Sequence, residues 1–388
     1  MANIEPAIGP LRPEERPVLE AILARALHFE SAQMAYWMEG AGTANYRVVR
    51  IAGRPVGGLA IVSTEQWFGG ERVPMAGIGS VGIAPEWRGR GAASLLLRGV
   101  LMELQETGVA LATLYPSTLP VYRKSGFERA GSTITYSLNL VSINLRAPLH
   151  LLPIATDEWQ TLANIRDRWV RQQDGAIERS PFLWQKIITP FGQESYAYQI
   201  MRGDTPEGYL IYTQGGKSMP LQVLDWCSCG RDAGVTLLAF LAGDRSMVTT
   251  ATLRAAPNDP LLQLLPEQCA TVSRAQSWLL RIVDVVGALS RRGYPPTLTA
   301  ELHLAVEDNL LPANTGAFVL RVAAGRGEVT HGGTGRLRLD VRALASLYTG
   351  YLTAGQLASI GALGGPAEDL ALADLVFAGA RPRLIDAF

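Results

Sequence analysis

The stretch SVGIAPEWRGRGAASLLLRGVL, residues 80–101, predicts a strand, a glycine-rich loop and a helix in direct succession. Residues 81–83 form the end of an apolar strand that Pro85 terminates. In residues 93–108, leucine and valine recur on one stripe of a helix. A second apolar run, 109–115, follows at once. Two apolar strands flanking one helix predict a parallel strand-helix-strand unit.

The loop Arg88-Gly89-Arg90-Gly91-Ala92-Ala93 has the chemistry of an anion site. A helix N-terminus presents unpaired backbone N–H groups and about half a positive charge, and small residues let a phosphate come close to them. Arg88 and Arg90 add charged donors beside these groups. We therefore expect a pyrophosphate site here. The alternative is an ordinary glycine-rich turn with two solvated arginines.

A competing motif overlaps this segment. Gly77-x-Gly79-x-x-Gly82 has the spacing of a dinucleotide-binding fingerprint. That fingerprint must follow a strand and open a helix, whereas these glycines lie before and within a strand that stops at Pro85. They are more simply explained as bulge or close-approach positions, so the sequence disfavours a nicotinamide cofactor.

The loop and its flanking elements resemble the GCN5-related N-acetyltransferases. The acetyl-coenzyme A loop of that superfamily reads Arg/Gln-x-x-Gly-x-Gly/Ala, which Arg88, Gly91 and Ala93 match. The preceding strand in that superfamily splays from its neighbour and holds the pantetheine arm. The resemblance implies that acetyl-coenzyme A is the co-substrate and that it binds to Val81, Gly82, Ile83, Arg88, Gly89, Arg90, Gly91, Ala92, Ala93, Ser94, Ser117 and Thr118.

Tyr122 is the proton donor that the resemblance implies. Together with Gly126 and Phe127 it fits a Tyr-x-x-x-Gly-Phe setting, in which the tyrosine of a short helix faces the thioester sulfur. A phenol with a pKa near 10 can protonate a thiolate whose acid has a pKa near 8.5 only when it is well placed. The alternative role is packing of the tyrosine on the sheet. For Ser117 and Thr118, a helix N-cap role is equally open.

The whole chain is long enough for more than one core. At about 150 residues per domain, 388 residues correspond to about 2.6 domains. Residues 196–213 repeat the strand, turn and strand pattern of residues 46–62, which favours a duplicated fold. A third region of strands and a Thr353-x-x-Gln356 capping box follows. We expect an α/β (α+β) protein with domains at 1–148, 149–283 and 284–388.

This layout resembles the Eis (enhanced intracellular survival) N-acetyltransferases, in which two acetyltransferase-like domains precede a sterol-carrier-like domain. Local matches lie at 278–289, 341–350 and 373–379, and an apolar tail leads to Phe388. The resemblance implies that the α-carboxylate of Phe388 is the general base and that the protein is a homohexamer. Its acceptors would be aminoglycosides or lysine-like amines.

The second acetyltransferase-like region departs from the cofactor pattern. Residues 229–234 lack the required spacing, and Asp232 would repel a pyrophosphate, so we expect no cofactor there. Cys227 and Cys229 form no metal-ligand spacing with the histidines, and we expect buried structural thiols and no metal. Candidate walls for a cationic substrate are Glu30, Tyr36, Trp37, Glu39, Trp67, Phe68 and Asp386.

Composition narrows the remaining alternatives. Thirty-five Lys and Arg balance thirty-five Asp and Glu, so there is no long-range field for nucleic acid or an anionic membrane surface. Three cysteines are too few for a disulfide framework, and no signal peptide is apparent, which favours the cytoplasm. The competing function is a non-catalytic lipid or acyl-CoA carrier that uses the sterol-carrier-like region.

Overall fold

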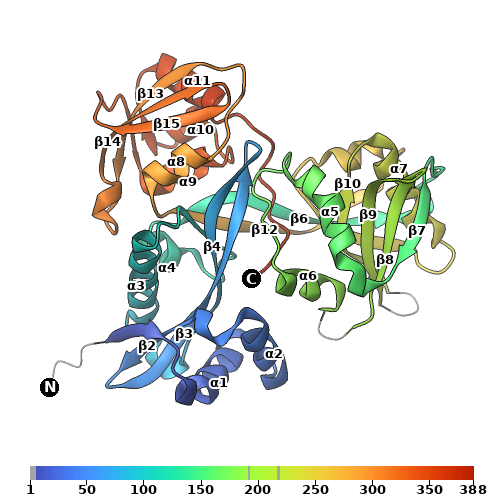
Figure 1. Ribbon diagram of the computed structural model, residues 1–388, viewed down its shortest axis with the longest axis horizontal. Helices are drawn as coiled ribbons and strands as arrows, with labels where there is room; N and C mark the ends of the chain where they lie inside the picture. The colour runs from blue at the N-terminus through green and yellow to red at the C-terminus, as the bar shows by residue number, and fades with distance from the viewer. Residues whose placement is uncertain (1–5, 191–192, 216–218) are drawn as a thin grey trace. The chain divides into compact units, whose positions relative to one another are not determined.

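A computed structural model describes residues 6–190, 193–215 and 219–388. The chain forms two compact units (Figure 1). The first unit comprises Met1–Gly131, Ser277–Ala380 and Asp386–Phe388, and the second comprises Ser132–Gln276 and Arg381–Ile385. The first unit therefore contains both the N-terminal motif region and most of the C-terminal third of the chain.

The N-terminal part of the first unit is a twisted sheet with helices on both faces. Its strands lie in the order β1-β2-β3-β4-β5-β12, and only β4 and β5 pair in parallel among the described pairs. The strands are β1 Ala7–Pro10, β2 Tyr46–Ile51, β3 Arg54–Phe68, β4 Glu71–Ile83, β5 Leu111–Leu114 and β12 Ala270–Ile282. The helices are α1 Arg16–Leu27, α2 Ser31–Ala41, α3 Ala92–Glu106 and α4 Leu119–Lys124.

The predicted strand, loop, helix and strand are confirmed, including the parallel pairing across α3. Leu59 and Ile61 of β3 pack into one core with the leucines of α3. Gly58, the residue directly before Leu59, faces Leu19 of α1 instead. Because successive residues of a strand point to opposite faces, α1 and α3 cover opposite sides of this sheet.

The C-terminal part of the first unit has its own five-stranded sheet, in the order β15-β14-β13-β16-β17 (Figure 1). The strands are β13 Ala300–Glu307, β14 Gly316–Ala323, β15 Arg326–His331, β16 Leu337–Asp340 and β17 Leu363–Gly364. The helices are α8 Val285–Arg291, α9 Val341–Tyr348, α10 Ala354–Ser359 and α11 Ala367–Val376. The predicted capping box is confirmed: the Thr353 side chain accepts from the Gln356 N–H, and Gln356 accepts from the Thr353 N–H.

The second unit repeats the first sheet. Its strands follow the order β6-β11-β10-β9-β8-β7, and helix α7 connects the parallel pair β10 and β11 as α3 connects β4 and β5. The strands are β6 Glu128–Asn139, which begins in the first unit, β7 His150–Ile154, β8 Tyr196–Arg202, β9 Thr205–Gln214, β10 Leu221–Ser228 and β11 Thr250–Ala255. The helices are α5 Trp159–Val170, α6 Pro181–Ile188 and α7 Arg231–Gly243. Ser180 is the N-cap residue of α6, and its side chain accepts from the Leu183 N–H. Cys227 and Ser228 belong to β10, and α7 begins at Arg231.

Candidate active site

A cavity of about 650 Å³ lies where β4 ends and α3 and α4 begin. Every residue predicted to bind the co-substrate lines it except Arg90, and Tyr122 lines it as well. The lining is Ala26, Val81, Gly82, Ile83, Trp87, Arg88, Gly89, Gly91, Ala92, Ala93, Ser94, Ser117, Thr118, Pro120, Val121, Tyr122 and Lys124. The structure therefore brings together segments that are about forty residues apart in the sequence.

The strand β4 diverges from β5 before it reaches this cavity. The parallel pairs join Met75, Ala76 and Gly77 to Leu111, Ala112 and Thr113, and no further pair is made along the described strand. On its other edge, β4 stays paired with β3 as far as Ile83. Residues 81–83 therefore form no strand pair on the β5 side, where the Ile83 C=O accepts from Arg88 Nε instead. This is the splay that a pantetheine arm would need.

The loop before α3 has a backbone shape that requires glycine. Gly89 and Gly91 have φ of 73° and 83°, in the left-handed region, and Gly91 is the N-cap residue of α3. The first helical hydrogen bond runs from the Leu95 N–H to the Gly91 C=O. The N–H groups of residues 92–94 precede it and form the anion-binding end of the helix.

The two arginines of the loop are held differently. Arg88 donates from Nε to the Ile83 C=O at 3.3 Å, so its guanidinium stays at the end of β4 in the cavity lining. The guanidinium carbon of Arg90 lies 5.1 Å from the centre of the ring of Trp87, a cation–π arrangement in which Trp87 lines the cavity and Arg90 does not. Arg88 is therefore the better placed of the two to meet a phosphate in the cavity.

Tyr122 is buried on α4, with only 4% of its surface exposed. Its ring meets Phe127 edge-on, with the ring centres 6.1 Å apart. Gly126 has a φ of 83°, which explains why the turn between these two aromatic residues contains glycine. Burial raises the pKa of the Tyr122 phenol, while a hydrogen bond from the Ser117 hydroxyl partly offsets that rise. At neutral pH the phenol is protonated.

The structure refines the two roles considered for Ser117 and Thr118. Thr118 is the N-cap residue of α4, but its side chain makes no capping hydrogen bond. The Ser117 hydroxyl bonds to the Tyr122 phenol, a contact that the sequence did not predict. Neither hydroxyl acts as the simple helix cap that was the alternative.

Phe388 lies directly on β4. A Cβ built on Gly77 would lie 2.6 Å from Cγ of the Phe388 ring, and one built on Gly79 would lie 2.6 Å from its carboxyl carbon and oxygen. A Cβ on Gly82 would lie 2.7 Å from Leu23 of α1. The interpretation of these three glycines as close-approach positions is confirmed. The apolar tail is packed as expected, since Leu384 is fully buried and Asp386 is 6% exposed.

The other candidates for a substrate wall have varied surroundings. Glu39 forms an ion pair with Arg16 at 2.9 Å, and Glu30 starts α2 in a capping box. Phe68 is fully buried with its ring centre 5.1 Å from that of Tyr348, which makes it a core residue. Trp37 and Trp67 are also mostly buried, whereas Tyr36 is exposed.

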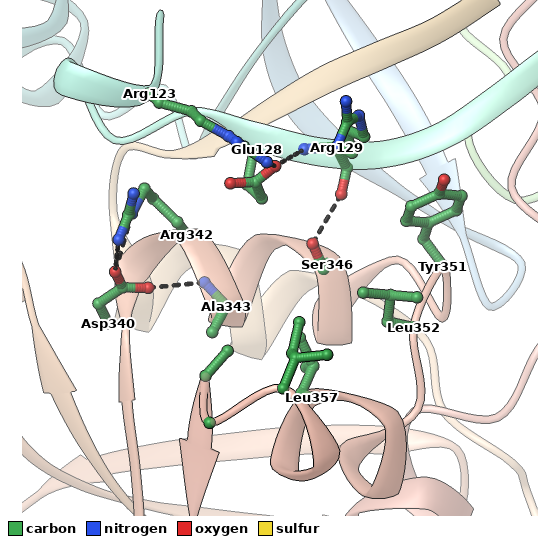
Figure 2. Close-up of a pocket in the computed structure, with 13 residues that line it drawn as sticks. Arg123, Glu128, Arg129, Asp340, Arg342, Ala343, Ser346, Tyr351, Leu352 and Leu357 are labelled. Atoms are coloured by element: carbon green, nitrogen blue, oxygen red, sulfur yellow. Dashed lines mark hydrogen bonds and ion pairs between the residues drawn. The ribbon is translucent and has the colours of Figure 1, made fainter. Parts of the chain in front are cut away.

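A second cavity of the first unit, of about 680 Å³, lies between the segment that starts β6 and helices α9 and α10 (Figure 2). On one side, Arg123 pairs with Glu128 at 2.7 Å, and the Ser346 hydroxyl donates to the Arg129 C=O at 2.6 Å. Leu352 and Leu357 supply an apolar side. None of the predicted site residues lines this cavity.

In the second unit, the structure contradicts part of the prediction for the cysteines. Cys227 is buried, but Cys229 is exposed, so the prediction of two buried thiols is wrong for Cys229, which lies beyond the end of β10. Asp232 pairs with Arg202 at 2.7 Å. Among the described residues, no group of three or more His, Cys, Asp or Glu side chains is arranged to hold a metal ion.

Family profiles match nearly the whole chain. Residues 7–130 and 175–282 each match an acetyltransferase (GNAT) domain, and residues 285–385 match a sterol carrier protein domain. These matches and the cavity at the end of β4 define a tandem GCN5-related acetyltransferase fold followed by a sterol-carrier-like domain. The mixed α/β architecture expected from the sequence is confirmed.

Individual related proteins support the same assignment as the family profiles. A crystal structure of a GCN5-related N-acetyltransferase from Anabaena variabilis ATCC 29413 is 38% identical, with a TM-score of 0.95 over 99% of this chain and 100% of that one. N-acetyltransferase Eis of Mycobacterium tuberculosis (strain ATCC 25177 / H37Ra) is 27% identical over 308 residues, 74% of this chain and 73% of that protein. The fold of Eis1 from Mycobacterium abscessus matches with a TM-score of 0.83 at 24% identity, over 99% and 100% of the two chains.

The chain therefore belongs to the Eis-type GCN5-related N-acetyltransferases. It is an acetyltransferase whose co-substrate is acetyl-coenzyme A. No helix in the described part of the chain has the length and apolar character to span a membrane.

Proposed function

We propose that the protein acetylates a primary amine of a small molecule in the first acetyltransferase domain, with Tyr122 as the acid and the α-carboxylate of Phe388 as the base. The observation that carries this proposal is the position of Phe388, whose carboxyl lies against Gly79 of β4. Two residues further along the same strand, the cavity lined by Tyr122 begins at Val81. The cavity proposed for the acetyl donor and the proposed base therefore lie along the same strand, β4.

Acetyl-coenzyme A is proposed to lie along that strand with its phosphates at the N-terminus of α3. The N–H groups of residues 92–94 and the guanidinium of Arg88 supply the donors for the pyrophosphate. The edge of β4 at residues 81–83, which does not pair with β5, supplies peptide groups for the amides of the pantetheine arm. The thioester would then lie between Phe388 and Tyr122.

The reaction needs one base and one acid. The bound ammonium group first releases a proton to solvent. The neutral amine nitrogen then attacks the carbonyl carbon of the thioester, a C–N bond forms, and the C–S bond breaks. The nitrogen loses a proton to the Phe388 carboxylate, directly or through a water, and the sulfur gains one from Tyr122. Both groups return to their starting states by exchange with solvent. Atoms and charge balance without a metal or a covalent enzyme intermediate.

The pKa values set requirements on both groups. Because burial raises the pKa of Tyr122, transfer of its proton to a thiolate is uphill by at least about 2 kcal/mol. The Ser117 hydroxyl offsets part of this cost, because it donates to the phenol oxygen and stabilises the phenolate. A carboxyl of ordinary pKa, near 3.5, is a weak base, so Phe388 must be partly desolvated or act through a water.

The proposed acceptor is a cationic amine of the aminoglycoside or lysine type. The support is chemical: the buried Asp386 carboxylate lies two residues from the Phe388 carboxylate, and two carboxylates attract an ammonium group. The relatives are named N-acetyltransferases, which indicates transfer to nitrogen in those proteins. We also propose, from the Eis resemblance, a homohexamer, which native mass spectrometry would test.

The test is an amine panel scored by release of free coenzyme A in chromatography and mass spectrometry. We expect turnover with a polyamine or aminoglycoside, at least 100-fold loss in Tyr122→Phe, and a similar loss when one glycine is appended after Phe388. Tyr351→Phe, in the other cavity, and Phe388→Leu, which keeps the carboxylate, are matched controls that should retain most activity. Normal turnover of the extended protein would exclude the terminal carboxylate as base.

A further inference from the structure

The second unit contains a pair of thiols that the proposed reaction does not use. Cys227 lies at the end of β10 and Cys229 just beyond it, with their sulfur atoms 4.0 Å apart. Cys227 is fully buried in an apolar cluster with Leu162, Ile165 and Tyr209. Cys229 is exposed. One sulfur is therefore reachable from solvent, and the other is held directly behind it.

Cys229 opens into a cavity of about 580 Å³ next to the N-terminus of α7. Arg168, Arg231 and Asp259 line this cavity, and Asp259 forms an ion pair with Arg383 at 3.4 Å. Asp232, the nearest acid on α7, is held by Arg202 at 2.7 Å. The surroundings of the accessible sulfur therefore favour a negative charge.

The two thiols differ in their pKa values. A hydrogen bond from Cys227, with help from the charge of Arg168, lowers the pKa of Cys229 to about 7, although partial burial and Glu207 oppose the shift. Burial raises the pKa of Cys227 well above its ordinary value. At neutral pH the exposed sulfur is about half thiolate, and the buried sulfur remains a thiol that can donate to it.

We propose that Cys229 and Cys227 form a peroxide-sensitive thiol pair, in which Cys229 is the attacking thiolate and Cys227 the resolving thiol. The Cys229 thiolate attacks a peroxide oxygen, the O–O bond breaks, and hydroxide leaves, which oxidises Cys229 to a sulfenic acid. The Cys227 sulfur then attacks the Cys229 sulfur, an S–S bond forms, and water leaves. Each turn reduces one peroxide and oxidises two thiols.

The geometry makes the second step a short movement. The sulfurs must close from 4.0 Å to the disulfide bond length of about 2.05 Å. Cys227 is fixed by the β10 ladder, where it pairs with Tyr209, so the closure falls mainly on Cys229 and the residues after the strand. Cys269 is also buried and is not part of the pair.

The expected selectivity follows from the thiolate fraction. A thiol with a pKa of about 7 has about 50 times more thiolate at pH 7 than one with a pKa of 9, and its lower basicity reduces nucleophilicity about eightfold. The net gain is about sixfold over an ordinary exposed thiol. The gain over the buried Cys269, whose pKa burial raises, must be larger still.

The test treats the whole protein with hydrogen peroxide at pH 7, alkylates it under denaturing conditions, and measures intact and peptide masses. Reduced protein should take up three alkyl groups. Oxidised protein should take up one, on Cys269, with a loss of two hydrogens in the peptide that contains Cys227 and Cys229, reversed by dithiothreitol. Peptide mapping of the wild-type protein decides the question even if a variant does not fold.

Variants assign the roles of the two sulfurs. Cys227→Ala should stop at a sulfenic acid on Cys229 that dimedone traps, Cys229→Ser should lose no thiols on the same timescale, and Cys269→Ser should behave as the wild type. The proposal is overturned if Cys269 oxidises as fast as Cys229, or if the product is a disulfide between chains. It is also overturned if the Cys229→Ser protein consumes Cys227 at the wild-type rate.

Discussion

The contact between Gly79 and the Phe388 carboxyl predicts a specific effect of adding one methyl group. In Gly79→Ala, the new Cβ would lie 2.6 Å from both the carboxyl carbon and oxygen of Phe388. Gly79 does not have a left-handed φ, so alanine fits its backbone, and the clash with Phe388 is the main obstacle. We therefore expect the variant to fold with its terminal carboxylate displaced.

The size of the displacement sets the expected loss of activity. Relieving a 2.6 Å contact to an ordinary separation of about 3.5 Å moves the carboxyl by about 0.9 Å. A misplacement of about 1 Å at a reacting group can reduce the rate about 100-fold, and overpacking costs about 1–3 kcal/mol of stability. We expect kcat to fall about 100-fold and the free energy of unfolding to fall by about 1–3 kcal/mol.

The assay separates this effect from general damage. Release of coenzyme A is followed by mass spectrometry, because the exposed Cys229 would react with a thiol reagent. Gly243→Ala, where a Cβ would meet nothing within 4 Å, should leave activity unchanged and should not lower stability. Deletion of Phe388 removes the clash, so Gly79→Ala should no longer destabilise the shortened chain. Wild-type kcat in Gly79→Ala, or equal destabilisation of both chain lengths, would refute the reasoning.

Three further predictions concern single side chains. Ser117→Ala should lower kcat about tenfold with little change in KM, because its hydroxyl stabilises the phenolate only as the proton leaves; an unchanged kcat would contradict this role. Arg88→Ala should raise the KM for acetyl-coenzyme A by about 10- to 100-fold, more than Arg90→Ala, and equal effects would contradict the assignment. Asp225→Asn should cost about 3–5 kcal/mol in urea unfolding at pH 7, because it breaks the buried ion pair between Asp225 and Arg179. Burial opposes ionisation of Asp225, but Arg179 holds its pKa below the ordinary value, so its stabilising contribution should be present above about pH 4 and lost on further acidification; stability flat from pH 7 to 2 would contradict this.

Local patterns predicted the elements that surround the cavity at the end of β4. The strand end, the glycine-rich loop and the apolar stripe of α3 are each specified within a few residues, and the cavity lining contains almost all of the residues that they contributed. Gly89 and Gly91 could be identified because their left-handed backbone leaves few other choices of residue. The capping box of α10 could be identified because the Thr353 and Gln356 side chains satisfy backbone N–H groups at the start of the helix.

Side-chain contacts and the exact ends of strands were harder to predict from the sequence. The hydrogen bond from Ser117 to Tyr122 depends on side-chain rotamers rather than on spacing. The exposure of Cys229 depends on where β10 ends, whereas burial of both thiols was predicted from the absence of a metal-ligand spacing. Phe68, proposed as a pocket wall, packs on Tyr348 from the C-terminal part of the chain, a partner that no local pattern indicates.

The Gly77-x-Gly79-x-x-Gly82 spacing has a structural cause in the bulge of β4. Gly82 pairs with Gly58 and Gly79 with Ala60, so β4 has one residue more than β3 between these pairs, and Ser80 adopts a φ of 50° there. Ile78 and Ile83, five residues apart, would face opposite sides of a regular strand, yet both pack in the core of α3. Because of this extra residue, Gly77, Gly79 and Gly82 all lie on the face of the sheet opposite to α3. On that face the glycines leave room for Phe388 and Leu23, which lie closer than a Cβ would allow. This close packing explains why a glycine spacing typical of nucleotide-binding loops occurs inside a strand.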